Sequence, residues 1–194
     1  MTRRCTELNQ VRVVSRTAHW LPDTDEFKAW ESQALRVSPL PLLVIDGKAG
    51  SGKSIIMHTT FVHARSHASP GKDIYILYCF DASNGSPLQN SQQGLYRSIL
   101  CQILDQIAPS VITAHYVRGW NENKSAHQDI VTLKDRIIRL LSQSGAEIVN
   151  IYVDALDECV GEDKDKASAA LEILEFLKTM GETGAPLISN ANRS

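Results

Sequence analysis

The stretch Val44–Ile56, VIDGKAGSGKSII, decides the fold prediction for this chain of 194 residues. It follows the pattern Gly-x-x-x-x-Gly-Lys-Ser, which begins at Gly47 and ends at Ser54. Glycines allow backbone angles that side chains forbid, so successive N–H groups can turn inward towards phosphate oxygens. In such a pattern the lysine reaches the β- and γ-phosphates and the hydroxyl serves as a magnesium ligand. The stretch therefore predicts a phosphate-binding loop between a buried strand and a helix.

We predict that all eight residues of this loop contact a nucleotide, and that Ser54 also binds Mg²⁺. The loop consists of Gly47, Lys48, Ala49, Gly50, Ser51, Gly52, Lys53 and Ser54. The helix that follows adds the positive end of its dipole to the same site. The predicted ligand is ATP or another nucleoside triphosphate, together with Mg²⁺.

Strands and helices are predicted to alternate along the chain. Short apolar runs predict buried strands, whereas apolar residues at helical spacing predict amphipathic helices. The predicted strands are 41–46, 74–80, 147–154 and a weak fourth strand at 185–189. The predicted helices cover about 53–65, 95–107, 130–141 and 167–177, with Gly181 and Gly184 ending the last one. This alternation is typical of an α/β fold with a mostly parallel sheet that is covered on both faces.

The third predicted strand ends in a group of acids, in the sequence NIYVDALDEC. An apolar strand that ends at Asp154 fits a Walker B strand, whose Asp reaches the magnesium shell. Hydrolysis also needs a carboxylate that orients or deprotonates a water. In many phosphate-loop ATPases that acid directly follows the first Asp, but here Ala155 occupies the place and the acids come later, at Asp157 and Glu158. Spacing alone leaves open which of the two positions the water.

These motifs resemble the NACHT branch of the STAND signal-transduction NTPases. DALDEC in particular resembles fungal NACHT proteins with a nephrocystin-like N-terminal domain. The stretch 19–33 is similar to that family's lead-in helix, and 86–104 is similar to its helix after the second strand. The resemblance spans about residues 15–190. It implies an ASCE-type P-loop NTPase fold, a three-layer sandwich in which the fourth strand inserts between the first and third.

The resemblance also implies residue roles and a function. Asp154 is expected to coordinate magnesium, and Asp157 or Glu158 to position the attacking water. The expected function is a conformational switch set by Mg-nucleotide binding and reset by slow hydrolysis. The family's setting is signalling in self/non-self recognition or regulated cell death, including heterokaryon incompatibility and processes like innate immunity. Protein partners or self-association are expected through parts outside this sequence.

Two other functions are compatible with the sequence. The chain could be a nucleotide-binding module or truncated product with little or no hydrolysis, or a small-molecule kinase. A kinase needs arginines over the phosphates, but Arg136 and Arg139 are more typical of a solvated helix face. Selectivity for GTP is unsupported, because 123–126 reads NKSA where a guanine site needs Asn-Lys-x-Asp. Trp20 and Trp30 could flank a base, although packing of the lead-in helix is the favoured role.

Composition excludes several other classes of function. The formal net charge is −2, so no basic field indicates nucleic-acid binding. No run of about 18 apolar residues predicts a membrane span, and no signal peptide is visible. The four cysteines form no C-x-x-C pair, and the one H-x-x-x-H spacing, at His63 and His67, has no cysteine beside it, so a metal site of protein ligands alone is not expected. We expect a cytoplasmic protein with reduced thiols.

The two ends of the chain complete the predicted organisation. Residues 1–36 are expected to form a lead-in segment with a helix, and 37–194 a single NTPase core. The ending PLISNANRS departs from the Ser-Ser-Arg type of sensor that the resemblance implies. Arg193 is therefore not assigned as a γ-phosphate sensor, and the fold is expected to be incomplete at the C-terminus. Pro186 is expected to weaken the fourth strand.

Overall fold

The computed structural model of the protein describes residues 18, 20–31, 42–81, 83, 86–107, 129–160, 166–182 and 187–191. Strands alternate with helices over most of this part of the chain, as predicted. The strands are β1 (Leu42–Asp46), β2 (Asp73–Cys79), β3 (Ile148–Asp154) and β4 (Leu187–Ala191). The helices are α1 (Asp25–Glu31), α2 (Lys53–Ser66), α3 (Gln92–Gln106), α5 (Ile130–Ser144) and α6 (Lys166–Glu182), with 3-10 turns η2 (Leu21–Asp23) and η4 (Leu156–Glu158).

The four strands form one parallel sheet in the order β1-β4-β3-β2. This confirms the predicted α/β fold with a parallel sheet, and the predicted central place of the fourth strand. Residue pairing is longest between β2 and β3, where Asp73 to Cys79 pair with Ile148 to Asp154. Between β3 and β4, pairing covers only Ile151 to Val153. The weakest seam of the sheet therefore lies next to the acidic strand.

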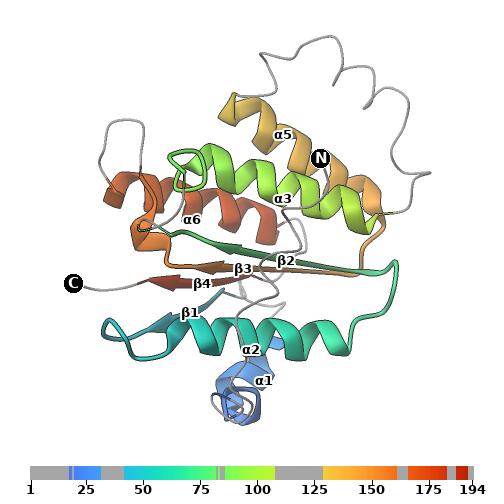
Figure 1. Ribbon diagram of the computed structural model, residues 1–194. Coiled ribbons are helices and arrows are strands. Elements are labelled where there is room, and N and C mark those ends of the chain that lie inside the picture. The colour runs from blue at the N-terminus through green and yellow to red at the C-terminus, as the bar shows by residue number, and fades with distance from the viewer. Residues whose placement is uncertain are drawn as a thin grey trace.

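The two faces of the sheet carry separate hydrophobic cores, because successive strand residues point to opposite faces. On β3, Tyr152 belongs to one core, while Ile151 and Val153 belong to the other. Helices α3, α5 and α6 lie over the face of Ile151, and α1 and α2 lie over the face of Tyr152 (Figure 1). The core on the α2 face contains Leu21, Phe27, Trp30, Met57, Phe61, Ala64, Tyr75 and Tyr152. The lead-in helix is thus packed onto the same layer as α2.

Local sequence signals explain where the helices begin and end. Ser91 caps α3, because its side chain accepts a hydrogen bond from the Gly94 N–H. Asp129 caps α5 in the same way through the Thr132 N–H, and Gly145 ends α5 with a φ of 67°. Gly94 is required for close approach, since an added Cβ would lie 1.9 Å from the Leu88 carbonyl oxygen.

Side chains of α3 cover the outer edge of the sheet at β2. The Gln106 amide accepts from the Tyr75 N–H at 2.9 Å and donates to the Tyr75 carbonyl at 2.9 Å. The Gln102 amide does the same at Leu77, with distances of 3.1 and 3.0 Å. Each amide therefore pairs with the backbone as a neighbouring strand would. Such cover satisfies groups that an edge strand otherwise exposes to other chains.

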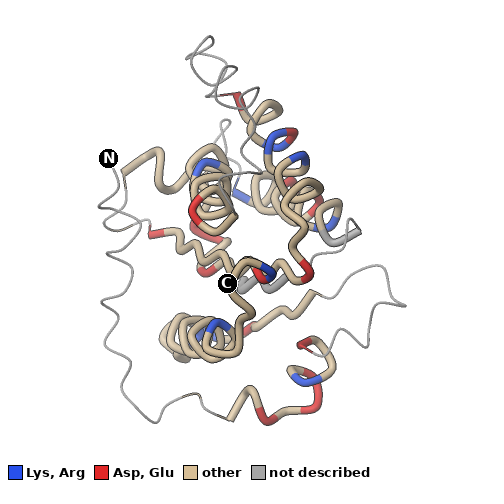
Figure 2. Tube along the Cα trace, turned by 90° about the vertical axis from the view of Figure 1, so that its right-hand side faces the viewer, with Lys and Arg blue, Asp and Glu red and all other residues tan. Residues whose placement is uncertain are grey.

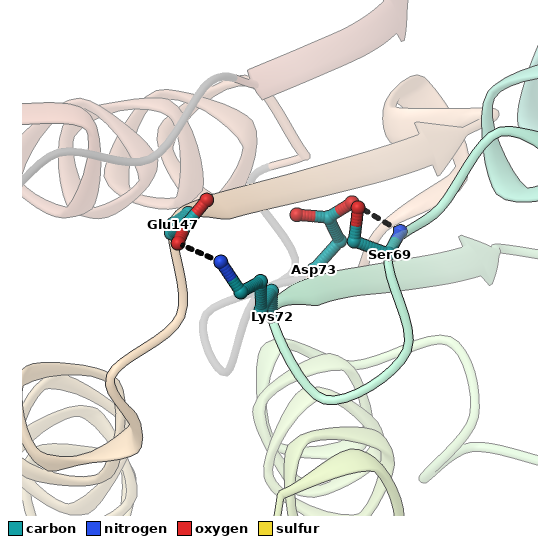
Figure 3. A network of polar contacts seen from close by, with 4 residues as sticks. All are labelled: Ser69, Lys72, Asp73 and Glu147. Carbon is teal, nitrogen blue, oxygen red and sulfur yellow. Dashed lines mark hydrogen bonds and ion pairs between the residues drawn. The ribbon is translucent and has the colours of Figure 1, made fainter.

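A polar network fixes the opposite, amino-terminal end of β2 and β3. The Lys72 ammonium lies 2.7 Å from Glu147 Oε1 (Figure 3). The Glu147 N–H also donates to the Lys72 carbonyl at 2.7 Å. The Ser69 N–H donates to Asp73 Oδ2 at 2.6 Å in the same turn. The side chains of Lys72 and Glu147 are exposed, so the pair supports the register of β2 and β3 without burying charge.

Most predicted element boundaries differ from the structure by a few residues, and two of these differences concern β4 and α6. Strand β4 begins at Leu187 and ends at Ala191, two residues later than predicted. Pro186, on which the prediction of a weak fourth strand rested, lies outside the described residues. Helix α6 ends at Glu182, so Gly181 lies within its last turn. One unfavourable glycine does not end a helix that is held by a buried apolar face.

Candidate functional site

The phosphate-loop sequence forms the turn between β1 and α2. Gly50 and Gly52 adopt φ angles of 76° and 88°, a region that residues with a Cβ rarely adopt. The Gly47 N–H donates to Asp46 Oδ1 at 2.8 Å, and the Ser51 N–H donates to the Lys48 carbonyl at 3.1 Å. Gly50 and Gly52 therefore adopt backbone angles that favour glycine, as the sequence predicted.

Lys53 is held inside this loop. Its side chain is buried, and the ammonium donates to the Gly47 carbonyl at 2.6 Å and to the Lys48 carbonyl at 2.9 Å. A buried ammonium requires such acceptors, because an unpaired charge away from water is costly. The loop therefore encloses a positive charge that is fixed in place by its own backbone.

The first turn of α2 adds hydrogen-bond donors to that charge. The N-cap of α2 is Gly52, which has no side chain to cap the helix. The first N–H groups of a helix have no intrahelical acceptor, so here they are left for an outside partner. Ser54 lies in this turn and is exposed. Together with Lys53, this end of α2 has the donors and the charge that an anion needs.

Asp154 ends β3 at the same end of the sheet, the carboxyl ends of the strands. The residue is only 5% exposed. By strand alternation it shares a face with Tyr152, which is the face that α2 covers. The loop and Asp154 therefore lie on the same side of the sheet, at the carboxyl ends of their strands, where parallel sheets bind ligands.

The strand register gives the spacing between the two halves of the site. Val44 on β1 pairs with Ser189 on β4, which pairs with Val153 on β3. Asp154 is therefore level with Ile45, just before the loop begins. Two strand spacings separate β1 from β3, which amounts to about 10 Å. The loop and the carboxylate thus flank the end of β4 at a separation that one phosphate–metal group can bridge.

The turn after Asp154 has an unusual backbone. Ala155 adopts φ 53° and ψ 43°, the left-handed conformation that costs a residue with a Cβ about 1–2 kcal/mol. Its carbonyl accepts from the Glu158 N–H at 2.9 Å, and the buried Leu156 anchors η4. Asp157 and Glu158 are both half-buried in this turn. Ala155, the small residue that follows Asp154, therefore has a backbone conformation that is rare outside glycine. Such conformations are common at functional sites.

Cys79, the last residue of β2, and Asp81, which follows the strand, also join the site, although the sequence did not single them out. The Cys79 thiol donates to Asp154 Oδ2 at 3.6 Å, and it lies in register with that residue. Burial and the neighbouring Asp154, Asp81 and Glu158 carboxylates raise the pKa of the Cys79 thiol to about 12. Asp81 follows the end of β2, and the strand-end rule that singled out Asp154 could have found it.

The backbone of Asp81 is fixed by a buried amide. The Asp81 N–H donates to Asn90 Oδ1 at 2.9 Å, and Asn90 Nδ2 donates to the Asp81 carbonyl at 2.7 Å. The Asn90 carbonyl in turn accepts from the Val160 N–H at 2.7 Å, just beyond η4. The loop before α3 therefore links the ends of β2 and β3, where the Asp81, Asp154 and Glu158 carboxylates all act electrostatically on the Cys79 thiol.

Other sequence predictions have clear outcomes in the described residues. Trp30 is buried and its ring contacts Phe27 and Tyr152, which confirms the packing role, whereas Trp20 is 60% exposed. Arg139 pairs with Asp135 on the exposed face of α5, as expected of a solvated helix face. Arg193 lies outside the described residues.

The described residues contain no feature that points to a function other than ligand binding at the strand ends. Lys and Arg are interspersed with Asp and Glu over the part of the chain that the structure describes (Figure 2). Within these same residues, no three His, Cys, Asp or Glu side chains gather into a metal site. None of the described helices combines the length and the apolarity that crossing a membrane requires. The clearest concentration of potential ligand-binding groups described here is the edge formed by the loop, Asp154 and η4.

Comparison with known protein families places this chain. Residues 16–188 match the family described as Nephrocystin 3, N-terminal. Comparison with curated proteins gives no significant match. Comparison with solved structures gives no significant match either. The family match covers the lead-in helix, the phosphate-loop sequence, the acidic strand and most of the described sheet, so the chain belongs to the Nephrocystin 3, N-terminal family.

Proposed function

We propose that this chain is the nucleotide-binding core of a STAND-type P-loop NTPase of the NACHT branch, which binds ATP with Mg²⁺ and hydrolyses it slowly as a conformational switch. The family match is consistent with an NTPase-like module. The sheet order β1-β4-β3-β2, with helices on both faces, is consistent with the three-layer sandwich of that class. As part of the same proposal, the protein acts in the cytoplasm in signal transduction.

One observation carries the proposal. Lys53 is buried against two carbonyls of its own loop, at the start of a helix whose N-cap has no side chain. This arrangement places a fixed positive charge beside N–H groups that have no acceptor within the helix. A turn with a purely structural role has no need of a buried lysine, because burying its charge costs free energy. A bound phosphate chain, in contrast, can accept hydrogen bonds from both the Lys53 ammonium and the first N–H groups of α2.

The residues also suit a magnesium ion beside the phosphates. Hydroxyl and carboxylate oxygens are the ligands that Mg²⁺ prefers. Ser54 would supply a hydroxyl from the first turn of α2, and Asp154 a carboxylate from the end of β3. Bound there, Mg²⁺ would neutralise phosphate charge during cleavage. Lys53 would hold the β- and γ-phosphates, and the loop backbone from Gly47 to Ser54 would cradle them.

Glu158 is our preferred residue for positioning the attacking water. It contributes to the electrostatic field at the Cys79 thiol, which lies beside Asp154. Asp157 remains the alternative, because both acids are half-buried in η4. The acid is offset from Asp154 by the left-handed turn at Ala155 instead of following it directly. We attribute slow turnover to that offset.

Calorimetry of Mg-ATP binding tests the proposal. Lys53→Ala removes charge-assisted hydrogen bonds and should weaken binding by about 10- to 150-fold. The matched control is Lys178→Ala, which removes an exposed lysine of α6, over the other face of the sheet, and should leave affinity near that of the wild type. Equal affinity of wild type and Lys53→Ala would refute phosphate binding by the loop.

Phosphate release separates the switch enzyme from a module that only binds. Glu158→Gln should lose turnover while keeping Mg-ATP affinity, and Asp157→Asn should retain turnover. The opposite pattern would assign the water to Asp157. Absence of turnover in a wild-type chain that binds Mg-ATP would favour the nucleotide-binding module instead.

A further inference from the structure

We propose that Cys79 is a positioning residue for Asp154: its thiol donates to the carboxylate and holds it in the orientation that magnesium binding needs. This inference rests on the proposed function, because it assigns a role to Cys79 within the same site. Cys79 would contact neither the nucleotide nor the metal. It would act only through the carboxylate of the neighbouring strand.

The sheet register brings the two side chains together. Cys79 and Asp154 are the last paired residues of β2 and β3, and both lie on the face that α2 covers. The thiol sulfur lies 3.6 Å from Asp154 Oδ2. Because parallel strands fix this pairing through seven residue pairs from Asp73↔Ile148 onward, the contact is set by the whole ladder and not by a loop.

The Cys79 thiol has two possible acceptors, the Asp154 carboxylate and the Phe80 carbonyl, and the carboxylate is the one that needs a donor more. Asp154 is only 5% exposed, and a buried carboxylate is strongly destabilised unless donors surround it. The thiol also lies 3.3 Å from the carbonyl oxygen of Phe80, the next residue in its own chain. A charged acceptor forms the stronger hydrogen bond, so we expect the proton to lie towards Asp154.

A neutral donor also suits the charges around it. Three carboxylates, those of Asp154, Asp81 and Glu158, act on the Cys79 thiol. A lysine or arginine at this position would form an ion pair with Asp154 and compete with a divalent cation for it. A thiol orients the carboxylate and leaves its full negative charge available. A valine or isoleucine would fit the strand but would donate nothing.

The test measures how nucleotide binding depends on Mg²⁺, using a fluorescent ATP analogue titrated with MgCl₂ and, separately, in EDTA. Cys79→Ala and Cys79→Val remove the donor, and Val also keeps most of the volume. Both should raise the half-saturating Mg²⁺ concentration by about three- to tenfold, the value of one hydrogen bond, and leave affinity in EDTA unchanged. Cys79→Ser keeps a donor and should restore most of the loss.

Two controls separate the possible outcomes. Cys101→Ala removes an exposed cysteine on α3 and should not change the Mg²⁺ dependence. A Cys79→Val variant with wild-type Mg²⁺ dependence would overturn the inference, as would a Cys79→Ser variant as impaired as Cys79→Ala. If wild type binds the analogue without any Mg²⁺ dependence, the inference fails but phosphate binding stands. If wild type does not bind the analogue at all, the proposed function fails with it.

Discussion

Removal of the Gln106 amide should weaken the sheet at the strand that carries Cys79. The amide makes two hydrogen bonds to the backbone of Tyr75, at 2.9 Å each, and its Nε2 also donates to the Gln102 carbonyl at 2.8 Å. A net hydrogen bond contributes about 0.5–1.5 kcal/mol, so the two bonds to β2 are worth about 1–3 kcal/mol. Water partly replaces them at this half-buried edge, and alanine favours the helix slightly. We therefore expect Gln106→Ala to lower the free energy of unfolding by about 1 kcal/mol.

Urea unfolding followed by circular dichroism measures this loss, which corresponds to a fall in Tm of about 2–4 °C. Amide hydrogen exchange adds a local measurement, because the Tyr75 N–H should exchange faster in the variant. Gln143→Ala on the exposed face of α5 is the matched control and should change stability little. A Gln106→Ala variant within about 0.3 kcal/mol of that control, with unchanged exchange at Tyr75, would refute the reasoning.

Two further predictions concern strain and ionisation. Ala155→Gly should raise the free energy of unfolding by about 0.5 kcal/mol, because relief of the left-handed conformation outweighs the conformational entropy that glycine loses on folding. Ala155→Val should lower the free energy of unfolding. Urea midpoints measure both effects, and a Gly variant less stable than wild type would contradict the prediction. Burial raises the pKa of Tyr78, Tyr96 and Tyr152. The neutral phenols therefore favour the folded state, and stability should hold up to about pH 10 and fall above it, as the unfolded tyrosines ionise. Urea midpoints at about pH 8 and about pH 10.5 measure this, and equal values would count against it.

The parts of this fold that were predicted correctly depend on local sequence. Helices α3 and α5 follow from apolar residues at helical spacing, such as Leu133, Ile137 and Leu140, all of which are buried. The loop and Asp154 follow from a motif and from its place at a strand end. The parallel sheet follows from the alternation of strands and helices. None of these required knowledge of which strands are neighbours.

The parts that were missed depend on contacts between distant residues. Cys79 and Asp154 are 75 positions apart, and nothing near Cys79 in the sequence marks it as a partner of an acid. The Gln106 contact to Tyr75 spans 31 positions, and a glutamine on a helix is ordinarily a solvated residue. Strand β4 was misplaced by two residues, because five residues with little alternation give no register by themselves.

The placement of β4 links the fold to the proposed switch. The loop follows β1 and Asp154 ends β3, so within the described sheet β4 stands between the two halves of the site. Five residue pairs join β1 to β4, but three join β3 to β4, and these three stop at Val153, one residue before the acid. A ligand held by both Lys53 and Asp154 would span this seam and add its binding energy to the weakest pairing in the sheet. Nucleotide would therefore bias the position of β3 and η4 relative to β1, because it would contact both sides only when the seam is closed.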